Sequence, residues 1–471
     1  MTDRLLEARE LADDKQYEKA WPILTELLYD EPDDPKILTV VCAVLDKQGN
    51  APLAYQIAKR VTELAPKAVA PWINLGKTAD ALWRYGESAN AYQRAMTLVD
   101  ARDTETKASI YNNLAALQVQ HGEFKRAKGN AEQALKLDPG FRRAMHNLGI
   151  SQLALREWVS GWKNFEASLG SDQRAMWKYG TEPTWTGEPG KTVVIYGEQG
   201  LGDEICAASM VDDAIARAIA PRVMAPSVGL PRGQLAPPSG KVILDCDARL
   251  AKLFARSFPA AKVYGTRTAK VLNWDEADHA IDYSIAAMQL GGLFRISEAD
   301  WHPKPYLKAD PEAVLMWKAL WAFKAKPAVG LAWSGGIPGT ARHVRSIDPS
   351  MLAPILGIDA HFVNLQYRQG PNPKGVHAYD HATFAADYDQ TASLVASLDA
   401  VVSVPTTVAH LAGALGVPTV AMKAKISCWK YESGLQFHPC TLVENSGDWG
   451  KTIDAAAMQL RVILARRKER K

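Results

Sequence analysis

Apolar residues in the first 170 positions recur with the three- and four-residue spacing of amphipathic helices, and this pattern repeats about every 34 residues. Each period is long enough for two helices, and a proline such as Pro139 ends the second helix. The periods keep one phase, apart from a five-residue insertion near 101–105, and begin at residues 1, 35, 69, 108 and 142. The pattern predicts five stacked helix pairs with a continuous core.

Small and aromatic residues occupy matching places within the periods. In the fourth period they are Tyr111, Leu114, Ala115, Gly122, Phe124, Ala127, Ala131, Ala134 and Pro139. This pattern resembles the tetratricopeptide repeat (TPR), in which W-x2-L-G-x2-Y is followed by Ala, Phe and Pro. The resemblance covers residues 1–170 and implies an all-α solenoid whose concave face binds an extended peptide or a partner protein.

One polar position of the repeat is a candidate for peptide binding in that groove. Asn precedes the Leu of the first helix in three successive periods, at Asn74, Asn113 and Asn147. Stacking would set three carboxamides in a row, and a carboxamide can both donate to and accept from a peptide backbone. Asn is also a frequent residue at this place in the repeat, so a purely structural row is the alternative.

A different pattern begins after residues 171–190, where glycines and prolines predict a linker. The apolar run Val193–Tyr196 is typical of a buried strand, and helical spacing starts at Ile205. Between them lie Gly197, Gly200, Gly202, Asp203 and Glu204. A strand, a glycine loop and a helix N-terminus in this order let backbone N–H groups approach a ligand, whereas a tight turn with Asp203 as helix cap is the alternative. The glycine spacing matches neither the dinucleotide fingerprint nor a P-loop.

Strand and helix patterns then alternate, which predicts parallel sheets in two α/β lobes, at 191–310 and 311–471. Residues 221–240 are rich in proline and glycine and predict an irregular insertion in the first lobe. Asp245 and Asp247 have the Asp-x-Asp spacing of some metal sites, but at a strand end Asp247 is better interpreted as a helix N-cap.

Two loops of the second lobe carry residue types that bind phosphate. The first contains the turn Gly335–Gly336 and three basic residues that could bind a phosphate, Arg342, His343 and Arg345. Arginine is well suited to this role, because its planar guanidinium group can bind a phosphate bidentately. The alternative is that these are solvated loop charges. The second loop precedes a small-residue helix, so free N–H groups and the hydroxyls of Thr406 and Thr407 would favour a phosphate there. His410, in the first turn of that helix, would reach a ligand or simply pack.

Taken together, Gly202-Asp203, the segment 333–336 with Arg345, and Thr406 to His410 resemble a GT-B glycosyltransferase of the heptosyltransferase-like kind. The resemblance spans about 191–465 and rests on order and spacing. It implies two Rossmann-like lobes and a terminal crossover helix that returns to the first lobe. Repeat arrays fused to such halves resemble bacterial protein O-glycosyltransferases, including flagellin-modifying enzymes.

This resemblance implies an inverting, metal-independent transfer of a sugar from a nucleotide-sugar donor to a hydroxyl, a Ser or Thr of a protein recruited by the repeats. Asp203 would be the base that takes the hydroxyl proton. The donor diphosphate would be held by Arg345, Thr406, Thr407, Gly335, Gly336 and His410, beside the loop backbone of Gly200 and Gly202. Gln366 and Met422 are candidates for contacts with the nucleotide base. Pro405 stands where the family often has an acidic residue, and the insertion 221–240 is a second departure.

Composition excludes some classes of partner and site. Lys and Arg number 55 against 52 Asp and Glu, so the net charge of +3 gives no electrostatic footprint for nucleic acid. The five cysteines include no Cys-x-x-Cys pair, which argues against zinc and against a disulfide framework. With neither a leader nor a long apolar run in the sequence, we expect a cytoplasmic protein without membrane insertion, metal or cofactor.

Two other functions remain open from the sequence. In one, the chain is a TPR scaffold whose transferase-like half no longer catalyses and only senses a nucleotide or docks a partner. In the other, the chemistry is retained but the acceptor is a glycan or a lipid-linked sugar, and the repeats serve assembly.

Overall fold

The structure is a computed structural model that describes residues 2–171, 174–220, 240–267, 269, 271–336, 342, 344–366, 372–379, 387–424, 429–432, 437–444 and 447–468. The predicted insertion, apart from Gly240, and His343 lie outside these residues. The chain divides into two compact units, Met1–Gln152 and Leu153–Lys471.

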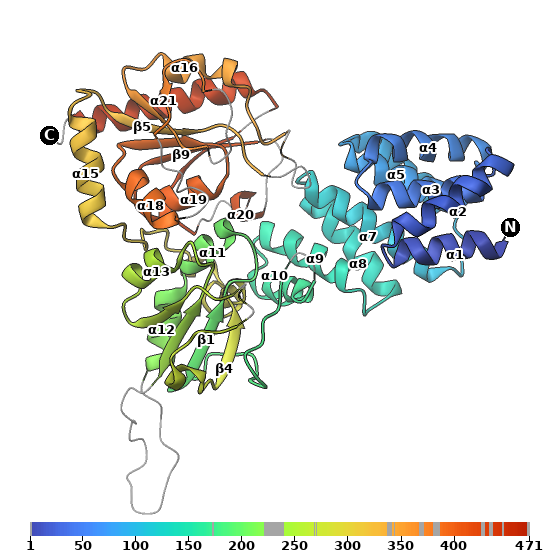
Figure 1. Ribbon diagram of the computed structural model, residues 1–471, viewed down its shortest axis with the longest axis horizontal. Helices are drawn as coiled ribbons and strands as arrows, with labels where there is room; N and C mark the ends of the chain where they lie inside the picture. The colour runs from blue at the N-terminus through green and yellow to red at the C-terminus, as the bar shows by residue number, and fades with distance from the viewer. Residues whose placement is uncertain are drawn as a thin grey trace, which may run out of the picture. The chain divides into compact units, whose positions relative to one another are not determined.

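The N-terminal region is built from consecutive helices joined in pairs by short turns, as predicted, and partners within each of the first four pairs pack together (Figure 1). The pairs are α1 (Thr2–Asp13) with α2 (Tyr17–Asp30), α3 (Pro35–Lys47) with α4 (Ala51–Leu64), α5 (Val69–Ala81) with α6 (Tyr85–Leu98), α7 (Thr104–Gln120) with α8 (Phe124–Leu137), and α9 (Arg142–Ala154) with α10 (Trp158–Phe165). This is a helical repeat of the TPR kind.

The turn inside each pair repeats one backbone conformation. A residue with positive φ occurs once in each of the five turns, at Lys15, Gly49, Trp83, Gly122 and Arg156, with φ between 60° and 79°. Successive positions are 34, 34, 39 and 34 residues apart, so the extra five residues fall between the third and fourth turns. Because this conformation favours glycine, the other three residues carry a local backbone cost.

Small residues allow the paired helices to approach closely. Ala20, Ala54, Ala95 and Ala127 are completely buried. At Gly76 a Cβ atom would lie only 2.6 Å from the ring of Tyr92. The repeat therefore requires these small side chains for packing, as the sequence pattern predicts.

The border between the two compact units falls at Gln152–Leu153, inside α9, so α10 lies in the second unit, whereas the sequence predicts the end of the repeats at residue 170. Trp162 packs so closely on α14 (Gly291–Phe294) that a Cβ at Gly291 would lie 2.3 Å from the indole ring. Trp158 meets Trp301 with ring centroids 4.9 Å apart. Both tryptophans are therefore core contacts of the second unit.

The predicted linker 171–190 is also built into this unit. Trp185 is 1% exposed, and its backbone N–H donates to the carbonyl of Ser284 at 3.0 Å. Arg174 is fully buried, and its Nη2 donates to Oε1 of Glu198 at 3.1 Å. Burial raises the pKa of Glu198, and the neighbouring guanidinium opposes that rise. The segment is therefore an anchored part of the fold.

Four parallel strands form the first sheet, in the order β3-β2-β1-β4. The strands are β1 (Thr192–Tyr196), β2 (Lys241–Asp245), β3 (Ala261–Tyr264) and β4 (Tyr283–Ala286). Its helices are α11 (Leu201–Ala208), α12 (Val211–Ile219), α13 (Ala251–Ser257) and α14. Strand β1 pairs with both β2 and β4, so the glycine loop leaves the middle of the sheet.

Six parallel strands form the second sheet, in the order β10-β9-β8-β5-β6-β7. They are β5 (Ala328–Ala332), β6 (His361–Asn364), β7 (Val376–His377), β8 (Ala400–Ser403), β9 (Thr419–Lys423) and β10 (Thr441–Glu444). The helices are α15 (Pro311–Ala322), α16 (Ala353–Leu356), α18 (Tyr388–Ala396), α19 (Thr407–Ala414), α20 (Trp429–Glu432) and α21 (Trp449–Lys468). A parallel-sheet α/β region follows the repeats, as predicted.

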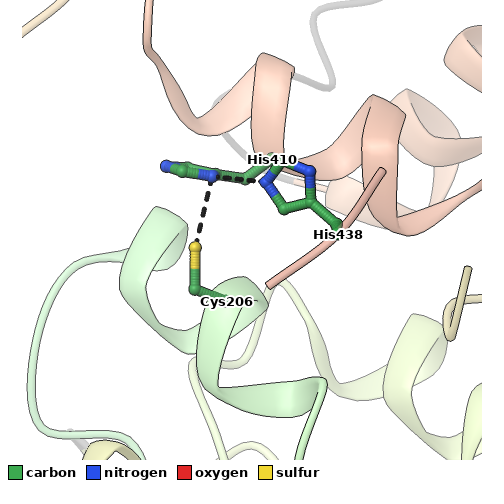
Figure 2. Close-up of side chains that lie close together, drawn as sticks. All are labelled: Cys206, His410 and His438. Carbon is green, nitrogen blue, oxygen red and sulfur yellow. Dashed lines mark hydrogen bonds between the residues drawn. The ribbon is translucent and has the colours of Figure 1, made fainter. Parts of the chain in front are cut away.

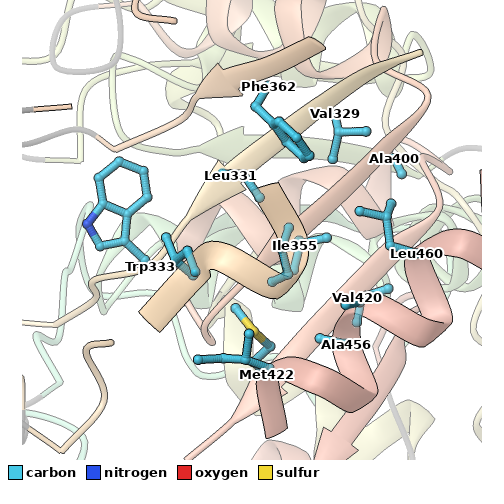
Figure 3. Packing of buried hydrophobic residues seen from close by; sticks show 14 of the residues in the cluster. Val329, Leu331, Trp333, Ile355, Phe362, Ala400, Val420, Met422, Ala456 and Leu460 are labelled. Carbon is cyan, nitrogen blue, oxygen red and sulfur yellow. The ribbon is translucent and has the colours of Figure 1, made fainter. Parts of the chain in front are cut away.

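The terminal helix covers its own sheet. In α21, Ile453, Ala456 and Leu460 are completely buried and pack with Val420 and Met422 of β9 (Figure 3). The helix packs on α16, β8, β9 and β10 of the second sheet. Among the described residues, the apolar face of α21 is covered by its own sheet, and the crossover to the first sheet stays a prediction. No helix within the described ranges combines the length and apolar character needed to span a membrane.

An internal carboxylate anchors the glycine loop. Gly197 leaves room for Glu204, since a Cβ there would lie 2.4 Å from its carboxyl carbon. Oε1 of Glu204 pairs with Arg267 at 2.6 Å, and Oε2 accepts the N–H of Asp247 at 3.0 Å. Burial raises the pKa of Glu204 to about 8 despite Arg267. Asp247 is not the predicted helix N-cap, because α13 begins only at Ala251 and Leu250 is its N-cap residue. Its side chain instead binds Arg249 and accepts the backbone N–H of the same residue.

We predict opposite effects on stability at equivalent turn positions. Lys15→Gly should stabilise the repeats by about 1 kcal/mol, because the exposed lysine has φ of 60°. Gly49→Ala should destabilise them by about 1 kcal/mol, although a Cβ there meets no atom within 4 Å. Urea unfolding of the full chain, followed by circular dichroism, measures both. The control is Gly129→Ala inside α8, which should stabilise; destabilisation there would show that alanine itself is not tolerated.

We also predict a pH-dependent effect of Glu204→Gln. The pKa of Glu204 in the fold, about 8, lies above its ordinary value of 4.5, so folding takes up a proton between these values. The stability of the wild type relative to the variant should be highest below pH 4.5 and fall as the pH rises to about 8. Thermal melts across this range measure the difference, with the exposed Glu312→Gln as control. A difference that stays constant with pH contradicts the prediction.

Candidate active site at the carboxyl ends of two parallel sheets

A cavity of about 430 Å³ lies where loops from the carboxyl ends of β1, β5 and β8 meet. In open α/β sheets, ligands bind at carboxyl strand ends where neighbouring strands continue in opposite directions. The second sheet has this arrangement, because β5 lies between β8 and β6. The first sheet contributes Gly200, Gly202 and Asp203, and the second contributes Gly336, Arg345, Gln366, Thr406, Thr407 and His410. These predicted residues, from distant parts of the sequence, thus line one cavity.

Asp203 lies in the first turn of α11 and contributes to the cavity wall. Its carboxylate pairs with the ammonium of Lys430 from α20, and the aspartate side chain remains 30% exposed. The ion pair holds the carboxylate toward the second sheet. Lys430 also lines the cavity and was missed in the sequence, because 227 residues separate it from Asp203.

The N-terminus of α19 forms the opposite part of the wall. Thr406 is its N-cap residue but makes no side-chain cap hydrogen bond with the described residues; its hydroxyl lies 3.1 Å from that of Ser403. Backbone N–H groups of the first turn are therefore uncapped where Thr406, Thr407 and Val408 line the cavity. Such a helix end attracts an anion.

Arg345 reaches the same loop. Its Nη2 donates to the carbonyl of Pro405 at 2.7 Å, so the guanidinium is held beside Thr406. The proline that departs from the family pattern thus supplies a backbone acceptor for Arg345. Positive charge and uncapped N–H groups lie at one edge of the cavity.

Gly335 and Gln366 shape the loop after β5. A Cβ at Gly335 would lie 2.5 Å from Cγ2 of Thr406, so glycine permits this close approach. Gln366 accepts the N–H of Ser334 through Oε1 at 3.2 Å and lines the cavity. Gly335 therefore acts through packing, whereas Gln366 stays within reach of a ligand.

One predicted contact is wrong. Met422 is 1% exposed and belongs to the hydrophobic core beneath the second sheet, so it contributes no contact to the cavity (Figure 3). Of the three predicted carboxamides, that of Asn147 is buried, and its Nδ2 donates to Oδ1 of Asn112 at 3.0 Å. Asn74 and Asn113 are partly exposed, and Nδ2 of Asn113 has no hydrogen-bond partner among the described residues.

His410 faces inward as well as toward the cavity. Its Nδ1 lies 3.2 Å from Sγ of Cys206 and 2.8 Å from Nε2 of His438 (Figure 2). Burial, followed by His438, Lys430 and Arg345, lowers the pKa of His410 well below its ordinary value. A neutral imidazole can offer a hydrogen bond to a phosphate, but it adds no positive charge.

One of the similar proteins matches most of the chain, and the others match a part of it. No known protein family matches the chain. Protein FlbA of Caulobacter vibrioides is 27% identical over 468 aligned positions, which cover 91% of this chain and 73% of FlbA. Mouse DnaJ homolog subfamily C member 7 is 30% identical over 90 residues, which cover 19% of this chain and 17% of the mouse protein.

Solved TPR structures are similar to part of the chain. The TPR protein TTC0263 of Thermus thermophilus has a TM-score of 0.31 and 17% identity, and the match covers 36% of this chain and 89% of the thermophilic protein. The pilF protein of Pseudomonas aeruginosa has a TM-score of 0.32 and 16% identity, and the match covers 35% of this chain and 73% of pilF.

Proposed function

We propose that this protein is a glycosyltransferase with a GT-B arrangement, which moves a sugar from a nucleotide donor to a hydroxyl group. The observation that carries the proposal is one cavity with Asp203 on one wall and the uncapped N-terminus of α19 with Arg345 on another. A carboxylate facing an anion site suits a reaction in which a hydroxyl loses its proton while a phosphate leaves.

In this mechanism the donor diphosphate lies against Thr406, Thr407 and Arg345. The helix N–H groups, the two hydroxyls and the guanidinium stabilise the charge that develops as the sugar–phosphate bond breaks. Gly335 keeps this loop close to the phosphate position by admitting the methyl group of Thr406. Gln366 is the remaining candidate for a contact with the nucleotide base.

Asp203 then takes the proton of the acceptor hydroxyl as its oxygen attacks the sugar carbon from the face opposite the leaving phosphate. This attack inverts the configuration at that carbon. The ammonium of Lys430 orients the carboxylate, and 30% exposure leaves it accessible to a hydroxyl. The acceptor we propose is a Ser or Thr of a protein bound by the TPR region, in the cytoplasm.

We predict that binding of one nucleoside diphosphate, or of its sugar, raises the melting temperature of the full-length protein. A ligand at about 100 times its Kd adds about 2.7 kcal/mol to the stability of the native state. Arg345→Ala should weaken binding tenfold to a hundredfold, because a charge-assisted hydrogen bond contributes about 1.5–3 kcal/mol. Exposed Arg461→Ala is the matched control and should bind normally. No shift with any nucleotide would favour the scaffold without catalysis.

Asp203→Asn is expected to separate binding from chemistry. It should lower the transfer rate by about 10²- to 10⁴-fold, as for loss of a general base, while nucleotide binding stays within about twofold. Mass spectrometry of a candidate acceptor, incubated with the donor identified by binding, measures transfer. Exposed Asp212→Asn on α12 is the control and should keep full activity. Transfer that survives the Asp203 change would remove this residue from the mechanism.

A further inference from the structure

We propose that Cys206, His410 and His438 form a binding site for a transition-metal ion, Zn²⁺ foremost, that joins the helix carrying Asp203 to the helix carrying Thr407. Cys206 comes from α11, His410 from α19, and His438 from the segment before β10. The three donor atoms lie within 4.8 Å of one another, and all three side chains are buried. Figure 2 shows the thiol of Cys206 and the ring of His438 both directed toward Nδ1 of His410.

The ligand types fit the ion. Zn²⁺ prefers thiolate and imidazole ligands, and sites with three protein ligands keep a fourth position for water or another group. A tetrahedral ion holds neighbouring ligand atoms about 3.3–3.8 Å apart, calculated from the usual bond lengths. The two contacts at Nδ1 of His410 measure 3.2 and 2.8 Å, so side-chain shifts of a few tenths of an ångström would open these contacts for the ion.

Hydrogen bonding alone satisfies this cluster poorly. An imidazole nitrogen carries either one hydrogen or one lone pair, yet Nδ1 of His410 faces both Cys206 and His438. It can therefore complete only one of these contacts with good geometry. One cation would use all three converging lone pairs.

Metal binding would use the lone pairs of the neutral imidazoles of His410 and His438 and the thiolate of Cys206. The thiol of Cys206 would lose its proton on binding, and the thiolate offsets one of the two positive charges. The nearby ammonium of Lys430 is itself paired with Asp203.

The placement gives the ion a structural role. Cys206 follows Asp203 by three residues on α11, and His410 follows Thr407 by three residues on α19, so each ligand lies one helical turn from a residue of the cavity. The bound ion would fix the two helix ends relative to each other. The proposal is argued from the three ligand residues alone and does not rest on the proposed transfer reaction.

Metal analysis of the full-length, tag-free protein tests this proposal. We expect one equivalent of Zn²⁺ per chain after purification or reloading, and Co²⁺ substitution should give a thiolate-to-cobalt charge-transfer band. Removing the metal should lower the melting temperature. Absence of that band in the wild type, or binding well below one equivalent, overturns the proposal without any variant.

Variants identify the ligands. Cys206→Ser and His438→Gln should each lower the metal affinity more than about 100-fold. This loss would exceed the loss of affinity usually seen when a residue that only orients a metal ligand is replaced. The matched control is Cys246→Ser, because Cys246 is also buried in the first sheet but bonds to the carbonyl of Tyr264. Equal metal content in Cys206→Ser and the wild type identifies adventitious binding and overturns the assignment. Nucleotide thermal shifts on the same proteins report the transferase proposal separately.

Discussion

The close packing of α11 on α19 is the contact on which the candidate site depends. Gly202 makes it possible, since a Cβ there would already lie 3.3 Å from Oγ1 of Thr407 and from the ring of His410. The cavity and the Cys206 cluster both border this contact. The glycine loop thus has a packing role that differs from backbone contact with a ligand. Both helices begin at carboxyl strand ends, so their N-termini meet where a ligand would bind.

The sequence was informative where the signal is local. Some features depend only on neighbours within one turn or one strand. They include the repeat period, the buried strands and the order of glycine, threonine and basic residues in the loops. Positive-φ turns at 34-residue spacing illustrate this, because a short turn imposes its own conformation whatever surrounds it. Predicted residues such as Thr406 line one cavity because parallel strands bring their carboxyl ends, and the loops that follow them, to one edge of the sheet.

Other features depend on partners far along the chain. No local sequence pattern marks Lys430 or Cys206 as a site residue. Lys430 contacts Asp203 across 227 residues, and Cys206 contacts His410 across 204 residues. The cysteine spacing argued against a zinc site, but such spacing reveals only ligands that are close to one another in the sequence. The proposed ligands Cys206, His410 and His438 are far apart in the sequence. The predicted contact of Met422 with the nucleotide base is wrong for a related reason. Strand β9 is buried on both faces, so alternation of apolar and polar residues does not indicate which side chain reaches the cavity. The proline- and glycine-rich stretch 171–190 looked like a linker, although Trp185 and Arg174 are buried within the fold.

The position of α10 changes how the two parts of this protein can be separated. By sequence it is the last helix of the repeats, yet its tryptophans fill the core of the α/β unit, and α9 runs through the border between the units. No single cut therefore leaves both an intact set of repeats and an intact α/β core. The fifth helix pair is shared between the repeats and the α/β unit. If the repeats are replaced by another array, that pair must therefore stay with the α/β unit. Only the first four pairs are interchangeable modules.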